Sequence, residues 1–245
     1  VARVAVGERV VADNERQCGV CAFCRRGEPL FWAQAVLQGV NAAGGFAEYV
    51  LVEEHQVYPL AAHLDFAAGA LVEPTACAVH GIDVMAPRAG DTVLQFGAGP
   101  TGLVLAQLLR HNGAASITLV DLSPAKLALA ARQTGAETVQ VRREAPEAHL
   151  DALHARAPQG YDLVIDATGV PRVQERLPQF AALGGKVVFY GVAPEDARIT
   201  ISPYEIFRRE LTLLGSFSQA HTFDRASRLV NAGVVQLADM VTHTF

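Results

Sequence analysis

The sequence is poor in cysteine, tryptophan and methionine: its 245 residues include four Cys, one Trp and two Met. Four cysteines are too few for a disulfide scaffold of this size. Three of them lie close together in the chain, which favours metal binding in a reducing compartment. No apolar run approaches the ~18 residues of a membrane span, and no charged-then-apolar leader opens the chain. We therefore expect a cytoplasmic protein with no membrane partner.

Long basic runs are also absent. Lys and Arg total 20 against 25 Asp and Glu, which gives a net charge of -5, so we expect no nucleic-acid partner. Hydrophobic residues make up 51% of the chain and charged residues 18%, a composition typical of a folded protein. At ~150 residues per domain, the length predicts one large domain or two small ones.

From residue 91 onward, short β-branched runs alternate with helical stretches. The runs lie at residues 92–96, 116–120, 138–141, 162–166, 186–190 and 211–215, and the helical stretches at 101–111, 124–134, 146–156 and 171–181. Apolar runs without alternation suit strands that are covered on both faces, and helical crossovers imply parallel pairing. We therefore predict an α/β domain over residues 87–245, built on a doubly wound parallel sheet of six strands.

The first 86 residues have a different pattern, with strands but no crossover helices between them. The predicted elements are strands at 4–12 and 45–58 and a helix at 64–85. Asp65 is placed to cap that helix. Pro87 and Gly90 interrupt the pattern, so we place the boundary between a β-rich first domain and the α/β domain within residues 86–90.

A glycine-rich turn follows the first apolar run of the α/β domain. It reads G-A-G-P-T-G and consists of Gly97, Ala98, Gly99, Pro100, Thr101 and Gly102. In a G-x-G-x-x-G turn the three glycines allow a tight turn, close approach to a pyrophosphate, and packing of the next helix on the strand. The N-terminus of that helix attracts the anion. The strand before and the helix after it favour a dinucleotide site over incidental glycines.

Asp121 ends the second strand, near the expected ~20 residues after the glycine turn. A carboxylate there accepts hydrogen bonds from the adenosine ribose hydroxyls and repels a 2′-phosphate, which predicts NAD rather than NADP. The alternative is a solvated turn Asp. Lys126 lies one turn into the next helix, where it either reaches the same ribose or remains a solvated surface side chain.

Cys18, Cys21 and Cys24 are spaced so that neighbouring thiolates can converge on one ion. Three interpretations remain open: a zinc site, an iron–sulfur site, or reduced cysteines without metal. A structural zinc takes four ligands. Glu28, Asp13 or a water would have to supply the fourth.

Glu73 is the one carboxylate in a strongly apolar helical stretch, residues 71–81. A buried carboxylate requires a cation, a hydrogen-bond donor or a metal, whereas a carboxylate turned to solvent at a helix N-terminus requires none. Both interpretations are open for Glu73. Cys77 and His80 are expected to be packing residues. The chain contains no G-x-S-x-G nucleophile elbow.

Several motifs together resemble those of the zinc-dependent medium-chain dehydrogenases, in particular their polyol (sorbitol, xylitol, arabinitol) branch. The motifs are G-E-R-V at 7–10, C-G-V-C-A-F-C-R-R-G-E at 18–28, G-G-F-A-E-Y-V at 44–50, V-E-P-T-A-C-A-V-H-G at 72–81, G-A-G-P-T-G at 97–102, D-L-S-P-A-K at 121–126, A-T-G-V at 167–170 and G-S-F at 215–217. No single motif is decisive, and together they extend over nearly the whole chain.

The resemblance implies a GroES-like catalytic domain, present here in part over residues 1–86, and a Rossmann domain that binds NAD. In this family a catalytic zinc polarises the substrate hydroxyl and favours hydride transfer to the nicotinamide. Glu73 matches a carboxylate lining that zinc. The residues matching segments that flank the nicotinamide are Thr168, Gly169, Val170, Gly191, Val192, Ser216 and Phe217. A homo-oligomer, dimer or tetramer, is also implied.

The chain departs from the family pattern at two zinc sites. Trp32 stands where the family has the fourth cysteine of its zinc lobe. The family's other catalytic zinc ligands precede the lobe, so the chain is expected to be an internal segment lacking both ends. We expect an NAD-dependent, zinc-assisted oxidoreductase that oxidises a polyol or secondary alcohol to the ketone. A threonine dehydrogenase-like enzyme and a non-catalytic NAD-binding fragment are the alternatives.

Overall fold

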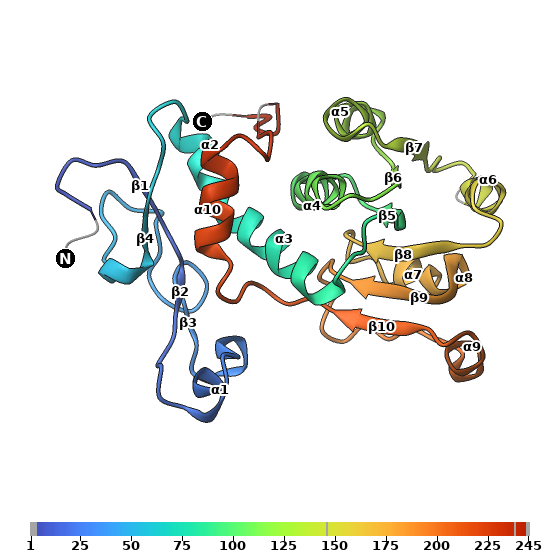
Figure 1. Ribbon diagram of the computed structural model, residues 1–245, viewed down its shortest axis with the longest axis horizontal. Coiled ribbons are helices and arrows are strands. Elements are labelled where there is room, and N and C mark those ends of the chain that lie inside the picture. Colours follow the sequence, from blue (N-terminus) through green and yellow to red (C-terminus); the bar gives the residue numbers. More distant parts are fainter. Residues whose placement is uncertain (1–3, 146, 238, 244–245) are drawn as a thin grey trace. The chain divides into compact units, whose positions relative to one another are not determined.

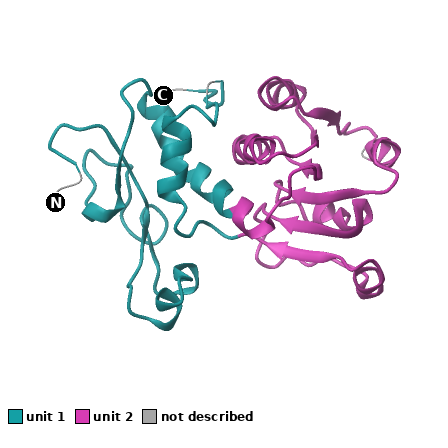
Figure 2. Cartoon of the chain, viewed as in Figure 1, with its two compact units in different colours: residues 1–80, 217–245 teal, residues 81–216 magenta. Residues whose placement is uncertain are grey.

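The computed structural model describes residues 4–145, 147–237 and 239–243. The chain divides into two compact units, of which unit 1 holds residues 1–80 and 217–245 and unit 2 holds residues 81–216 (Figure 2). The last segment thus belongs to the same unit as the N-terminal residues, whereas the sequence pattern grouped it with the α/β domain. Within the described residues, no helix is both long and apolar enough to cross a membrane.

Unit 2 is built on a six-stranded sheet in which every neighbouring pair is parallel, as the sequence predicted. The strands are β5 (Thr92–Phe96), β6 (Ser116–Asp121), β7 (Glu137–Gln140), β8 (Tyr161–Asp166), β9 (Ala181–Phe189) and β10 (Thr212–Gly215). Their order across the sheet is β10-β9-β8-β5-β6-β7 (Figure 1). The order reverses beside β5, and ligands of such sheets bind outside the carboxyl ends of the strands at that point.

The helices of unit 2 follow the predicted alternation. They are α4 (Pro100–His111), α5 (Pro124–Thr134), α6 (Ala148–Arg156), α7 (Pro171–Gln174), α8 (Leu177–Phe180) and α9 (Pro203–Arg209). Ser123 caps α5 by accepting a hydrogen bond from the N–H of Lys126 at 3.4 Å. The prediction of one helix over 171–181 was wrong, because the chain forms two short helices there. Pro178 lies in the second of them and provides no N–H for a continuous helix.

The core of unit 2 lies between the sheet and its helices. Leu94, Val164 and Val187 point from three neighbouring strands into a cluster that includes Leu177 and Phe180 of α8, all at most 1% exposed. Burying each side chain of this size contributes about 1.5–3 kcal/mol. The carboxyl ends of β5, β6 and β8 are thereby fixed against a rigid core.

Unit 1 contains two small antiparallel pairs and several short helices. Its elements are β1 (Val10–Ala12) with β4 (Val57–Pro59), β2 (Glu15–Arg16) with β3 (Val36–Leu37), α1 (Ala22–Arg25), η1 (Pro29–Phe31), η2 (Glu54–Gln56), α2 (Phe66–Ala70) and α10 (Phe223–Asn231); α3 (Val72–Met85) begins in this unit. Asp65 caps α2, as predicted, by accepting from the N–H of Ala68 at 2.7 Å. The predicted helix over 64–85 is divided at Leu71 into α2 and α3.

The strands predicted over 4–12 and 45–58 are much shorter in the structure. Only Val10–Ala12 and Val57–Pro59 pair as strands. Phe46, Tyr49 and Leu51 are each at least 89% exposed, and residues 45–53 have no strand partner among the described residues. A β-branched and aromatic composition favours a strand only where a neighbouring strand can pair with it.

Candidate functional site

The glycine turn connects β5 to α4. Gly97 has φ of 102°, a left-handed conformation that L side chains rarely adopt. A Cβ on Gly102 would overlap the carbonyl oxygen of Gly97. Gly99 is the N-cap of α4 and Pro100 its first residue, so the helix begins with N–H groups that have no intrahelical acceptor. The local geometry is that of an anion-binding turn.

A buried glutamine that the sequence analysis did not single out lies in β5 beside this turn. Gln95 is 0% exposed, and its Nε2 donates to the carbonyl oxygens of Gly97 at 2.9 Å and Gly102 at 2.8 Å. The only sequence signal for it is one amide side chain within the apolar run 92–96.

Asp121 is the last residue of β6, and backbone N–H groups hold its carboxylate on both sides. Oδ2 accepts from the N–H of Ala98 at 2.8 Å, and Oδ1 accepts from the N–H of Ser123 at 2.8 Å. An ionised carboxylate offers about four acceptor positions, so both oxygens retain capacity for ribose hydroxyls. The carboxylate is fixed in place before any ligand arrives.

A cavity of about 590 Å³ opens at the carboxyl edge of the sheet, within the range of ordinary cofactor sites. It is lined by Phe96, Gly97, Gly99, Val120, Asp121, Leu122, Lys126, Val141, Glu147, His149, Leu150, Ala167, Thr168, Val170, Arg172, Val173, Arg176 and Phe180. Six of the predicted cofactor residues are among them: Gly97, Gly99, Asp121, Lys126, Thr168 and Val170. The apolar members form a surface suited to a purine ring, and Asp121 and Lys126 bring opposite charges to the same cavity.

The two predicted segments 168–170 and 191–192 are held together by Asp166, which is 0% exposed. Its carboxylate accepts from the N–H of Thr168 at 2.8 Å, the Thr168 hydroxyl at 2.5 Å and the N–H of Gly169 at 3.1 Å. Gln174 donates to Asp166 at 2.8 Å and to the carbonyl oxygen of Gly191 at 3.3 Å. Neither Asp166 nor Gln174 was among the predicted site residues, although an Asp at the end of an apolar strand is a detectable signal.

The remaining predicted cofactor residues, Ser216 and Phe217, lie on either side of the division between the units. The N–H of Ser216 donates to the carbonyl oxygen of Phe189 at 3.1 Å, which fixes its backbone beside the end of β9. Phe217, the first residue of the last segment of unit 1, is 62% exposed.

In unit 1, Cys18, Cys21 and Cys24 have Sγ atoms within 4.8 Å of one another. The Sγ atoms of Cys18 and Cys24 are 3.7 Å apart, whereas thiolates bound to one tetrahedral zinc at about 2.3 Å lie about 3.8 Å apart. The N–H groups of Cys21 and Val20 lower the pKa of the Cys18 thiol to about 7, which favours the thiolate that a metal requires. The Cys18–Cys24 separation therefore fits one edge of a zinc tetrahedron, and Cys21 Sγ lies within 4.8 Å of both.

No fourth protein ligand joins the three cysteines within the described part of the chain. The carboxylate of Asp13 accepts from the N–H of Glu15 at 2.9 Å and from Gln219 at 2.7 Å. Glu28 forms an ion pair with Arg26 at 2.9 Å. These two carboxylates are thus engaged elsewhere, and neither is grouped with the three cysteines in the described part of the chain.

Glu73 lies in the first turn of α3, half-buried, and its Oε1 accepts from the Cys77 thiol at 3.5 Å. Burial and the neighbouring Glu73 carboxylate raise the pKa of Cys77, so this thiol stays protonated. Glu73 belongs to no group of three or more ligand-type side chains among the described residues. A catalytic zinc takes three protein ligands, so Glu73 and its neighbours do not fit such an ion.

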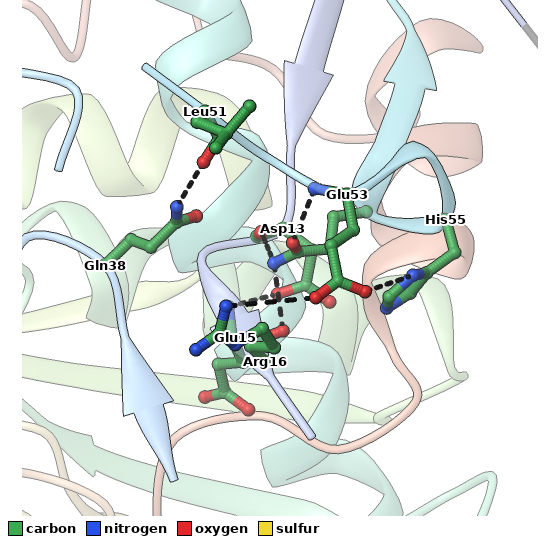
Figure 3. Close-up of polar contacts among 8 residues, drawn as sticks. Asp13, Glu15, Arg16, Gln38, Leu51, Glu53 and His55 are labelled. Carbon is green, nitrogen blue, oxygen red and sulfur yellow. Dashed lines mark hydrogen bonds and ion pairs between the residues drawn. The ribbon is translucent and has the colours of Figure 1, made fainter. Parts of the chain in front are cut away.

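A second carboxylate of unit 1, Glu15, is 8% exposed and accepts a hydrogen bond from the Ser218 hydroxyl. Burial, with the negative charges of Asp13 and Glu73, raises the pKa of Glu15 to about 7. Gln56 donates to the carbonyl oxygens of Asp13 at 2.8 Å and Glu15 at 3.2 Å. Figure 3 labels Asp13 and Glu15 among the neighbouring polar side chains. Sequence analysis missed Glu15 as a buried group because charged residues surround it in the chain.

Comparison with known proteins identifies the class to which this geometry belongs. The family described as "Zinc-binding dehydrogenase" matches residues 100–232, and "Alcohol dehydrogenase GroES-like domain" matches residues 1–62. The chain belongs to the zinc-binding medium-chain dehydrogenases, a family of oxidoreductases that act on CH–OH groups. The resemblance that the sequence motifs indicated is thereby confirmed.

The relatives are named for different alcohols. D-arabinitol dehydrogenase 1 of Uromyces fabae is 40% identical, with 100% of this chain covering 70% of the relative. D-altritol 5-dehydrogenase of Agrobacterium fabrum is 35% identical over 97% of this chain and 69% of the relative. L-threonine 3-dehydrogenase of Bacillus subtilis is 30% identical over 100% of this chain and 70% of the relative.

Solved structures share the fold and differ in the nucleotide that they contain. A protein of Sinorhizobium meliloti 1021 described as a zinc-binding dehydrogenase and bound to NADP has a TM-score of 0.89 and 34% identity, over 96% of this chain and 69% of that one. An alcohol dehydrogenase of Escherichia coli CFT073 complexed with NADH has a TM-score of 0.87 and 26% identity, over 98% of this chain and 70% of that one.

Proposed function

We propose that this protein is an NAD-dependent, zinc-assisted oxidoreductase that oxidises a secondary hydroxyl of a polyol to the ketone. The observation that carries the cofactor assignment is Asp121, whose carboxylate lines the cavity and is held by two backbone N–H groups at 2.8 Å. A fixed carboxylate at the end of β6 accepts hydrogen bonds from ribose hydroxyls and disfavours a 2′-phosphate.

Cofactor binding is tested by titrating NADH into the 245-residue protein and following nicotinamide fluorescence, with ADP as competitor. We expect saturable binding that ADP displaces, because the glycine turn and the Asp121 cavity both bind the ADP half. Absence of binding by NADH and by ADP would remove the basis of the proposal.

Zinc is part of the proposal through the family to which the chain belongs. The three cysteines are candidate ligands of a structural ion, and Glu73 is one candidate ligand of a catalytic ion whose other ligands are not grouped with it among the described residues. A catalytic zinc supplies a Lewis acid that lowers the pKa of the substrate hydroxyl. In the proposed reaction this chain supplies the nucleotide site, which includes the glycine turn and the segments 168–170 and 191–192. It also supplies the Glu73 carboxylate. Homo-oligomerisation and a cytoplasmic location remain predictions, the first of them accessible to analytical ultracentrifugation.

A polyol substrate is supported by the relatives named for D-arabinitol and D-altritol, at 40% and 35% identity. A threonine dehydrogenase-like activity is the alternative, supported by a relative at 30%. A chimera tests the choice: these 245 residues replace the aligned segment of the Uromyces fabae relative, and the product is assayed with D-arabinitol, D-altritol and L-threonine. Preferential oxidation of threonine would contradict the polyol assignment.

A non-catalytic nucleotide-binding protein is the second alternative. The chimera distinguishes this case as well, provided that the unmodified Uromyces fabae enzyme is assayed beside it. A folded chimera that binds NADH and oxidises none of the three substrates would favour the non-catalytic interpretation.

A further inference from the structure

Gln95 joins the two ends of the glycine turn through a single side-chain amide. Its Nε2 lies 2.9 Å from the carbonyl oxygen of Gly97, where the turn begins, and 2.8 Å from that of Gly102, in the first turn of α4. Gln95 itself is fully buried in β5. One donor group in the core therefore fixes the spacing between strand end and helix start.

The peptide group between Gly97 and Ala98 is held from both sides. Its carbonyl oxygen accepts from Gln95, and its N–H donates to Asp121 Oδ2 at 2.8 Å. Because a trans peptide is planar, its C=O and N–H point in opposite directions. Gln95 on the core side and Asp121 on the cavity side thus set the orientation of one peptide plane.

The next peptide that Gln95 touches, between Gly102 and Leu103, is held in the same manner. Its carbonyl oxygen accepts from Gln95, and its N–H donates to the carbonyl oxygen of Gly99 at 2.8 Å. A Cβ on residue 102 would lie 3.1 Å from Gln95 Nε2. The third glycine of the turn therefore leaves room for the Gln95 amide as well as for the Gly97 carbonyl group.

Among the residues that the structure describes, the side-chain amide of Gln95 has hydrogen-bond partners on its donor side only. Gln95 Oε1 is buried and has no hydrogen-bond partner within the described residues. An unpaired buried acceptor destabilises a fold, and this cost offsets part of the stabilisation from the two hydrogen bonds that Nε2 donates. A strand that is otherwise apolar at its buried positions retains this amide where it contacts the turn.

We propose that Gln95 is a positioning residue for the pyrophosphate of the cofactor: it holds the glycine turn in the conformation that presents backbone N–H groups to the phosphates. This inference rests on the proposed nucleotide site. Preorganised donors bind an anion without first being ordered, so loss of the Gln95 amide weakens phosphate binding. Binding of the adenosine portion depends on Asp121 and the apolar cavity, and Asp121 keeps its second donor, Ser123.

The test compares ADP with adenosine, which lacks the phosphates, by calorimetric titration of the full 245-residue protein. Gln95→Met keeps the side-chain length and removes the donor. We expect its affinity for ADP to be about tenfold lower, because the net contribution of a hydrogen bond is of this order. The affinity for adenosine should change less than about twofold. The measured quantity is therefore the ratio of the two affinities, which general destabilisation of the fold would leave unchanged.

Gln107→Met is the matched control. Gln107 is a buried glutamine of α4 whose Nε2 donates to Gln133 Oε1 at 3.0 Å. Its substitution removes a buried amide from the same unit without touching the turn, so the ratio of ADP to adenosine affinity should stay at the wild-type value.

Gln95→Glu keeps the inference falsifiable if the Met variant does not fold. A buried, protonated Glu offers one O–H donor, so its ADP-to-adenosine ratio should lie between those of wild type and Gln95→Met. If the ratio of ADP to adenosine affinity is unchanged in the Gln95 variants, or if both affinities fall equally, Gln95 does not position the turn for the pyrophosphate. A wild-type protein that binds neither ligand would instead overturn the proposed nucleotide site itself.

Discussion

The Sγ atoms of Cys18 and Cys24 lie 3.7 Å apart, the separation expected of two thiolates on one tetrahedral zinc. Cys21 completes a triangle with them. No fourth ligand joins them among the described residues. Because structural zinc sites are closed by four protein ligands, three thiols alone bind the ion weakly.

We therefore expect weakly held zinc at the cysteine site. Zinc content measured by mass spectrometry after dialysis against a chelator should be substoichiometric in the wild type. Trp32→Cys should raise the retained zinc toward one per chain, since the motif resemblance places Trp32 where the family has its fourth cysteine. Tight stoichiometric zinc in the unaltered protein would show that another ligand closes the site.

Glu15 predicts a pH-dependent stability with a definite sign. Its pKa in the folded protein is about 7, raised from 4.5 chiefly by burial. A carboxyl group whose pKa is higher in the folded state stabilises the fold fully below pH 4.5, and this stabilisation is lost as the pH rises through 7. The loss is on the order of 3 kcal/mol, since one pKa unit corresponds to about 1.4 kcal/mol.

Glu15→Gln should flatten the pH dependence of the free energy of unfolding between pH 4.5 and about pH 7. Denaturant unfolding at several pH values measures it, with Glu28→Gln as an exposed control. Burial also raises the pKa of Asp13. The Glu15→Gln variant should therefore keep a smaller pH dependence of the free energy of unfolding, with the same sign. A Glu15→Gln profile parallel to that of the wild type would contradict the assignment.

The 245-residue protein should bind the nucleotide without catalysing the reaction. Glu73 is the one residue that the motif resemblance places at a catalytic zinc, and it belongs to no group of three ligand-type side chains in the described residues. Without three ligands an ion is not held at useful occupancy. We expect NADH to bind, while no NAD reduction is detected with sorbitol, xylitol, arabinitol or threonine. NAD reduction that requires both zinc and Glu73 would prove this expectation wrong.

The α/β part of the fold could be predicted from the sequence because its signals are local. The strand at Thr92–Phe96 and the helix at Pro124–Thr134 have the predicted bounds. Buried parallel strands read as apolar runs, and capping residues such as Ser123 mark where helices begin. Of the strand predicted over 45–58, only the end forms, as part of β4 (Val57–Pro59), because pairing depends on a partner strand that no local pattern reveals.

The candidate site residues that belong to a sequence motif could be predicted. Those whose importance comes from burial could not. Gly97 and Asp121 were predicted from the motif and its strand–helix context, and both line the same cavity. Gln95, Asp166 and Glu15 were missed, because a polar side chain becomes informative only when the fold removes it from water. Whether it faces solvent or core is decided by tertiary packing.

The central claim is that Asp121 selects NAD at the carboxyl edge of the sheet. The most direct measurement is the ratio of the dissociation constants of NADP and NAD for the wild type and for Asp121→Ala, by calorimetric titration. We expect the wild type to bind NAD about 10–100-fold more tightly, the range for hydrogen bonds to a charged group. Asp121→Ala should lose most of that preference. Equal or tighter binding of NADP by the wild type would contradict the claim and would indicate that Lys126, in the same cavity, receives a 2′-phosphate.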